Sequence, residues 1–100
     1  MDNDAKMLEQ LGTALTTLQI KFRASSLADR IKLRPDLDDL LEKYSEYQSK
    51  LLDKGTMSTD DDLEEMEEIT ADIDAAAKKQ ELAAAIARTA AFIAIKVAAA

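Results

Sequence analysis

The scarcity of proline and glycine constrains the fold more than any other feature of this sequence. Only three of its 100 residues are of these types, namely Gly12, Pro35 and Gly55. β-Sandwiches and barrels need such residues at their many turns, so this chain has too few to build one. Ala, Leu, Glu, Lys and Asp dominate instead, and as a set they favour helix. We therefore predict an all-α fold in a single helical domain over residues 1–100.

Apolar spacing and the two breakers place the first two helices. Apolar residues recur at alternating steps of three and four from Leu8 to Phe22, which predicts a long N-terminal helix over residues 4–33, capped by Asn3 or Asp4. Pro35 is expected to end it, because the residue before a proline is driven out of the α region. A second helix then covers residues 36–54 and stops at Gly55, which can take the left-handed conformation.

A third helix is predicted over residues 59–97. Ser58 or Thr59 can cap it, with Asp61 or Asp62 at the capping-box distance. The link over residues 56–59 is short, so the helices 36–54 and 59–97 are expected to form an antiparallel hairpin. The apolar face moves around this helix within residues 75–80, which indicates either a bend or a change of packing partner. The predicted architecture is a three-helix bundle.

The last twenty residues are almost free of charge. After Glu81 only Arg88 and Lys96 interrupt an apolar run, and an Arg near the middle of a membrane span costs about 2.5–3.5 kcal/mol. We therefore expect burial by protein rather than a span, with an amphipathic helix on a membrane as the weaker alternative. The covering surface can be the N-terminal helix or another chain, which makes a homo-oligomer or a partner helix a candidate. The residues expected at that contact are Leu82, Ile86, Phe92, Ile93 and Val97.

A run of carboxylates opens the third predicted helix. Metal binding is disfavoured because the chain has no His for a di-iron site and no Gly-centred loop for calcium. DNA mimicry requires far more negative charge. These two interpretations are the less favoured ones, and the other two are preferred: a solvated helix face, and a binding face for a basic protein partner. The candidate residues are Asp60, Asp61, Asp62, Glu64, Glu65, Glu67, Glu68 and Asp72.

Basic residues cluster in the segment IKFRASSLADRIKLR. They form a possible patch for an anion or an acidic partner. The preferred interpretation is that they complement the acidic start of the predicted helix 59–97, within the fold or between subunits. The residues concerned are Lys21, Arg23, Arg30, Lys32 and Arg34.

The sequence lacks the residues and motifs of most enzyme classes. It has no Cys and no His, and no phosphate loop, dinucleotide fingerprint or zinc spacing, so we expect no catalytic, metal or cofactor site. Tyr44 and Tyr47 fall on the Leu face of the second helix, where we expect packing with the hydroxyl at the rim. The net charge of −7 argues against nucleic acid, and the acidic start is unlike a signal peptide, which makes the cytoplasm the expected location.

Size and charge resemble those of small bacterial and phage proteins that neutralise or chaperone other proteins. The resulting expectation is a non-enzymatic helical module that inhibits, neutralises (as an immunity protein or antitoxin does) or chaperones a partner protein by occluding its surface, with a basic protein as the candidate partner. A self-assembling structural subunit and a membrane-active helical protein are the alternatives.

Overall fold

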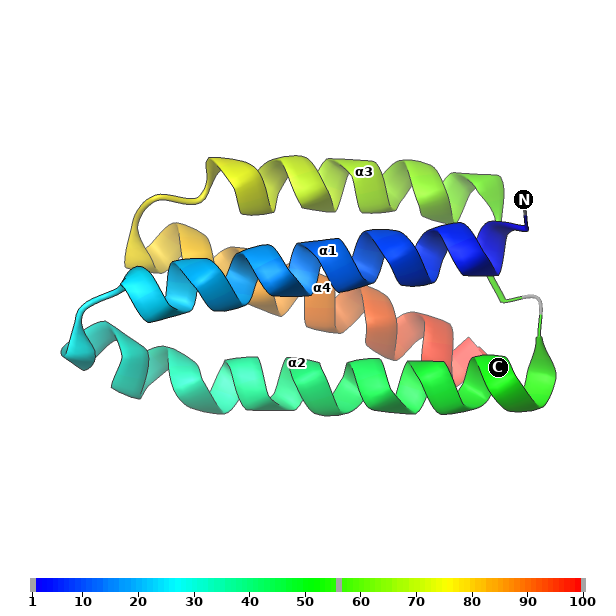
Figure 1. Cartoon of the computed structure of the whole chain (residues 1–100), viewed down its shortest axis with the longest axis horizontal. Helices are drawn as coiled ribbons and strands as arrows, with labels where there is room; N and C mark the ends of the chain where they lie inside the picture. The colour runs from blue at the N-terminus through cyan, green and yellow to red at the C-terminus, as the bar shows by residue number, and fades with distance from the viewer. Residues whose placement is uncertain (1, 56, 100) are drawn as a thin grey trace.

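Four α-helices make up the protein (Figure 1). The computed structural model describes residues 2–55 and 57–99. Within these residues the chain forms no strand, and its helices are α1 (Asn3–Ala24), α2 (Leu27–Lys54), α3 (Asp60–Ala75) and α4 (Lys79–Ala99). The all-α prediction is confirmed, whereas the three-helix arrangement is replaced by a bundle of four.

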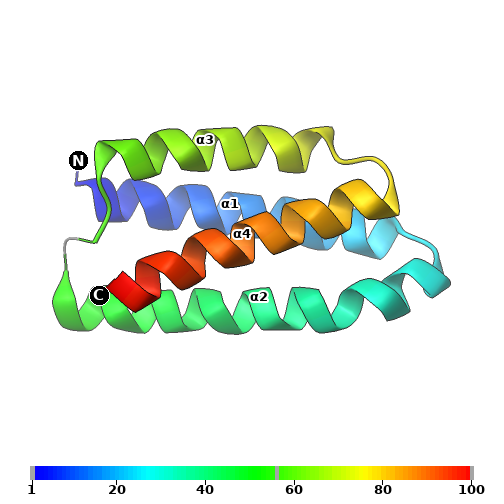
Figure 2. The same cartoon turned by 180° about the vertical axis from the view of Figure 1, so that it is seen from behind.

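The helices are neighbours in an order that differs from their order in the sequence. α1 and α3 run in one direction along the bundle, and α2 and α4 run in the other (Figures 1 and 2). α2 packs most extensively on the obliquely crossing α4, and α1 packs most extensively on α3. In the described part of the chain α2 and α3 do not contact each other, because they occupy diagonal corners. The expected hairpin between the second and third helices is therefore wrong: the link after Gly55 crosses the end of the bundle.

One apolar core runs along the inside of the bundle, and all four helices contribute to it. α1 buries Leu11, Leu15 and Leu18 of the predicted three-and-four run, and also Met7, which lies outside that run. The core contains few aromatic side chains, so its volume is filled by aliphatic residues and methionine, which pack at high density. The principal core residues of the other helices are Leu33, Leu37, Leu40, Tyr47, Met66, Ile69, Ile73, Leu82, Ile86, Phe92 and Ile93.

The first helix ends nine residues before its predicted limit. α1 stops at Ala24 because Ser25 and Ser26 leave the helical conformation and cap the two helices that meet there. The Ser25 hydroxyl donates to the carbonyl of Lys21 at 2.9 Å, and the Ser26 hydroxyl accepts from the backbone N–H of Asp29 at 3.2 Å. The prediction of a helix over residues 4–33 overlooked this pair, although a serine three residues before an acidic residue is a helix-start signal.

Pro35 lies inside α2 and does not end a helix. A proline in a helix interior removes one backbone hydrogen bond and costs about 3 kcal/mol relative to alanine. Pro35 and Ile31, the residue whose carbonyl loses its donor, are both exposed, so water can hydrate that carbonyl. The second helix therefore begins at Leu27, and its predicted start at residue 36 is wrong.

The predicted helix over residues 59–97 is interrupted at residues 76–78. Ala76 takes an extended conformation (φ −66°, ψ 120°), and the chain reverses there to begin α4. The Lys21 ammonium donates to the carbonyls of Asp74 and Ala76 at 2.8 and 2.7 Å, which satisfies the end of α3. The Glu81 carboxylate accepts the N–H groups of Ala77 and Lys78, both at 3.0 Å, at the start of α4. The shift of the apolar face within residues 75–80 thus marks a turn between two helices.

The caps of α2 and α3 agree with the sequence. Gly55 ends α2 at φ 71° and ψ −153°, a positive-φ conformation that is open essentially only to glycine but differs from the left-handed helical one that was expected. Thr59 and Asp62 form a reciprocal capping box at the start of α3. The cap of α1 is Asp2 rather than Asn3 or Asp4. The Asp4 carboxylate accepts instead from the backbone of residues 57 and 58, tying α1 to the link. Thr56, part of the predicted link, lies outside the described residues, as do residues 1 and 100.

Candidate interaction surface

α3 presents carboxylates on the side that faces away from the core. Met66, Ile69 and Ile73 are fully buried on its inner side. The outer side carries six exposed acidic residues, which we call the acidic face: Asp60, Asp61, Glu64, Glu65, Glu67 and Glu68. The apolar residues of α3 recur about every three to four positions, which matches the helical period of 3.6 residues. They therefore share one side of the helix, and the acidic residues between them lie on the other. The acidic face is therefore continuous along the first half of α3.

Two basic residues of α4 neutralise only part of this charge. Lys96 pairs with Asp62 at 2.5 Å, where both side chains are 16% exposed. Arg88 pairs with Asp72 and lies 3.6 Å from Glu68. In residues 2–55 and 57–99 no ion pair involves the other five carboxylates of the acidic face.

Asp62 is the most constrained carboxylate of α3. Partial burial would raise its pKa, but hydrogen bonds from Lys96 and from Thr59, together with the charge of Lys96, hold that pKa below its ordinary value. Asp62 therefore stays ionised and serves the capping box and the ion pair between α3 and α4. It contributes to stability rather than to the exposed surface.

The acidic face is shallowly hollowed beside α4. A depression of about 280 Å³ is lined by Asp61, Glu64, Glu65, Glu68 and Arg88. Four of its five lining side chains are carboxylates and the fifth is Arg88, so the depression carries a net negative charge. In the described residues no group of three His, Cys, Asp or Glu side chains is arranged to hold a metal ion.

The predicted basic patch is divided by the fold. Lys21 is used within the molecule, where it caps the end of α3. Arg34 pairs with Asp38 one turn along α2, at 3.2 Å and with both side chains more than half exposed. Arg23 and Lys32 are exposed, and Arg30 is half-buried. Within one molecule the expected pairing of this basic run with the acidic start of α3 is not formed, because Arg88 and Lys96 of α4 take that role. The alternative, that the run pairs with α3 of another subunit, stays a prediction.

The residues expected to contact another chain through the C-terminal helix lie mostly inside the bundle. Leu82, Ile86, Phe92 and Ile93 are buried against the other helices, and Val97 is half-buried. The chain itself therefore covers the apolar stripe that seemed to need a partner.

The outer side of α4 remains apolar. Its exposed residues after Leu82 are alanines, Arg88 and Ile95, and the Ile95 side chain is 67% exposed. Among the described residues, α4 is the one helix long and apolar enough to cross a membrane. A core helix of a soluble protein meets the same criteria of length and composition.

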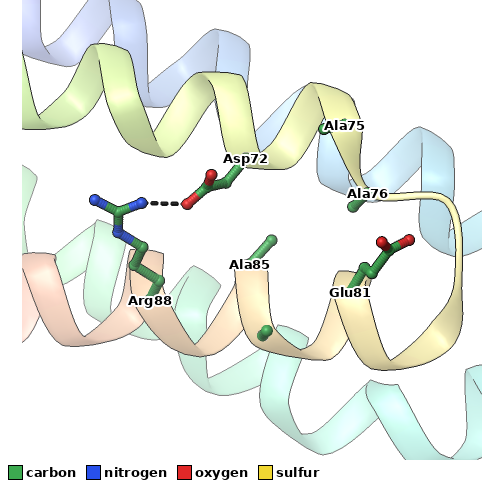
Figure 3. A pocket seen from close by; sticks show the side chains of 7 residues that line it. Asp72, Ala75, Ala76, Glu81, Ala85 and Arg88 are labelled. Atoms are coloured by element: carbon green, nitrogen blue, oxygen red, sulfur yellow. Dashed lines mark hydrogen bonds and ion pairs between the residues drawn. The ribbon is translucent and has the colours of Figure 1, made fainter.

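A second hollow lies between the end of α3 and the start of α4 (Figure 3). It has a volume of about 310 Å³, and Asp72, Glu81 and Arg88 surround a floor of alanines. Each of these charged groups already has a partner: Arg88 pairs with Asp72, and Glu81 caps the turn, which lowers the pKa of Glu81 through its two backbone hydrogen bonds. The hollow is therefore best explained as the gap left by small side chains at the turn.

Tyr47 and Ser58 form a buried polar pair that sequence reasoning missed. Their hydroxyl oxygens are 2.8 Å apart, and both residues are almost completely buried. Burial raises the pKa of the Tyr47 hydroxyl, and the bond to Ser58 opposes that shift. The expectation that this hydroxyl lies at the rim is wrong for Tyr47, whereas Tyr44 is only half-buried.

No protein-family model, curated protein or solved structure matches this chain.

Proposed function

We propose that this protein is a non-enzymatic helical module that binds another protein and inhibits, neutralises or chaperones it by covering its surface. The observation that supports the proposal most directly is the acidic face of α3. It is exposed, it is held on a capped helix, and five of its six carboxylates have no ion pair in the described structure.

The distribution of charge supports the same proposal. α3 holds nine of the 20 acidic residues and no basic residue, so the rest of the chain carries 11 acidic and 13 basic side chains. The net negative charge of the molecule therefore resides on one helix. Such a concentrated field accelerates the encounter with a basic surface and disfavours acidic competitors.

Rigidity also favours binding through this helix. The acidic residues stand on a helix whose inner side is fully buried, so its backbone loses little conformational freedom on association, and only the exposed side chains have to be ordered. An immunity-like or antitoxin-like role needs this kind of preformed surface, which meets a basic active or binding surface of the partner.

Charge removal on α3 tests the proposal. Partner proteins are captured from the source cells on wild-type protein and on the variant Glu64→Gln/Glu65→Gln/Glu67→Gln, then identified by mass spectrometry. Association rates with the captured partner are measured at several salt concentrations. We expect the variant to associate at least about tenfold more slowly and with a flatter salt dependence.

The matched control removes the same charge from α2 through Glu42→Gln, Glu46→Gln and Asp53→Asn, which are also exposed. Equal association rates for the α3 variant and the α2 control would contradict a role for the acidic face.

Membrane association through α4 is a second candidate, favoured by the length and composition of that helix and by its alanine-rich outer side. It requires α4 to leave the bundle, which exposes the core and breaks the ion pairs of Arg88 and Lys96. Flotation with vesicles of anionic and of neutral lipid tests it directly. Protein that remains unbound to both kinds of vesicle at pH 7 and at pH 4 would exclude this candidate.

A further inference from the structure

The corner where α1 meets α2 combines exposed aliphatic and cationic side chains. Leu27 and Ile31, on successive turns of α2, are each 66% exposed. Together with Phe22, Arg30 and Arg34 they line a hollow of about 190 Å³. We call these five residues the basic corner. Single exposed aliphatic residues are ordinary, but two of them beside two guanidinium groups form a surface that matches an acidic, partly apolar helix.

The guanidinium groups of the basic corner are available to a new carboxylate. The ion pair between Arg34 and Asp38 is highly exposed, and exposed ion pairs contribute little stabilising free energy, so Arg34 can exchange Asp38 for another carboxylate. Arg30 is half-buried, and its Nε is buried without a hydrogen-bond partner in the part of the chain that the structure describes, so this atom can reach an outside carboxylate only if the side chain changes its conformation. Arginine binds carboxylates in a planar, bidentate geometry, so each of these side chains can donate hydrogen bonds to an acidic residue of another molecule.

The acidic face and the basic corner lie at opposite ends of the molecule. α2 begins at one end of the bundle, whereas the acid-rich start of α3 lies at the other end and on the diagonal helix (Figures 1 and 2). The bundle is 40 Å long, so the two surfaces cannot meet within one molecule. They can meet between two molecules that are shifted along this axis.

We infer that the basic corner docks the acidic face of a second copy of this chain. Arg30 and Arg34 enter between the α3 carboxylates, while Leu27 and Ile31 cover the exposed Ala71 and the methylene groups of the glutamates. The two surfaces are different, so the contact is heterologous and leaves one free surface at each end. Association of this kind continues into open chains or closes into a ring. The inference rests on the proposed function, because it assigns a basic partner to the acidic face.

Two single-surface variants test the inference. The corner variant carries Leu27→Gln, Ile31→Gln and Arg34→Gln, and the face variant carries Glu64→Gln, Glu65→Gln and Glu67→Gln. All six side chains are exposed, so the fold is retained, which circular dichroism checks. Masses are measured by sedimentation equilibrium over a range of protein and salt concentrations.

At low salt the mass of the wild-type protein is expected to rise with protein concentration to values above that of a dimer. At high salt its association constant is expected to be at least about tenfold lower. Each variant alone is expected to stay at the monomer mass of 11.0 kDa. An equimolar mixture of the two variants retains one intact contact and is expected to reach a plateau at twice that mass. A control with Leu52→Gln and Lys54→Gln, which changes an exposed Leu and a cation elsewhere on α2, should behave as wild type.

A wild-type protein that stays monomeric at every concentration overturns the inference, as does a mixture of the variants that fails to form the heterodimer. A closed dimer that survives in either variant alone overturns it too. The proposed function is tested separately by the association of a different, captured protein. If that association does not depend on the α3 charges, the proposed function is contradicted, whether or not the chain self-associates.

Discussion

At the scale of single residues, the polar groups inside the bundle contribute to specifying its packing. The Tyr47 and Ser58 hydroxyls satisfy each other where no water reaches them, and Tyr47 is among the largest fully buried side chains. A buried polar group without its partner is costly, so this pair favours one register of α2 against the link.

Removing one hydroxyl tests this role. Tyr47→Phe should lower the free energy of unfolding by about 1–2 kcal/mol, because Ser58 would remain buried without a partner. Urea unfolding followed by circular dichroism measures the change. Tyr44→Phe is the control, since Tyr44 is half-buried, and it should cost less than about 0.5 kcal/mol. Equal effects of the two substitutions would show that the buried pair contributes nothing specific.

The role of Gly12 could not be decided from its residue type alone, because it depends on what packs against this position of α1. The sequence leaves open a close helix crossing or a tolerated surface glycine. In the structure a Cβ at this position would lie 3.6 Å from the Tyr44 hydroxyl, an ordinary contact distance, so the backbones are not in forced proximity. Nothing in its surroundings requires glycine.

At the scale of elements, the sequence predicts correctly that the chain is helical. It predicts where a helix ends only if the residues that end it are close to that point in the sequence. The helix stop at Gly55 and the capping box at Thr59 and Asp62 depend on neighbouring residues alone, and both were predicted. The break at Ala76 is capped partly by Lys21, 53 and 55 residues away from the carbonyls that it contacts. The local shift of the apolar face within residues 75–80 therefore indicated a bend or a change of packing partner but did not identify a turn between two helices. Pro35 misled the prediction because the exposure of its backbone, rather than its identity, determines whether a helix tolerates it.

Pro35 can be replaced to measure what the helix loses by containing it. Pro35→Ala restores the backbone N–H and should raise the free energy of unfolding by about 1–3 kcal/mol. Chemical denaturation measures this gain. Ala28→Ser, at another exposed position in the first turns of α2, serves as the control and should change stability by less than about 0.7 kcal/mol. A destabilised Pro35→Ala variant would contradict this account of α2.

At the scale of the whole molecule, the distribution of charge links stability to pH. The pKa values of Asp62 and Glu81 are both lowered in the folded state. A group with a lowered folded-state pKa binds its proton less tightly than in the unfolded chain, so its contribution is complete above the ordinary pKa. That contribution is lost as the pH falls through the folded-state value.

Stability should therefore decrease as the pH falls below about 4, the region of the ordinary aspartate pKa. Asp62→Asn should cost about 1 kcal/mol at pH 7 through the weakened cap and the lost ion pair with Lys96. The variant should also lose less stability than wild type between pH 5 and pH 2, in thermal melts recorded across that range. Parallel pH profiles for the two proteins would show that Asp62 is not the responsible group.

The order of the helices around the bundle could not be predicted from the sequence. The acidic face was recognisable from α3 alone, and the structure places its residues on the surface as the periodicity indicates. The diagonal placement of α2 and α3 follows from which apolar stripes fit together, and several arrangements satisfy the same periodicity. Of the basic corner, Arg30 and Arg34 belong to the basic run recognised in the sequence, whereas Leu27 and Ile31 were missed. In the sequence these two residues continue an apolar stripe, and only the fold leaves them uncovered.

The diagonal link between α2 and α3 also determines how the chain folds. Each half of the sequence, α1 with α2 and α3 with α4, contributes only part of a core, because the most extensive contacts join α1 to α3 and α2 to α4. Each half can bury most of its apolar surface only by packing against the other half. The closing of these long-range contacts therefore governs the folding rate, and the molecule is expected to fold as one cooperative unit rather than hairpin by hairpin.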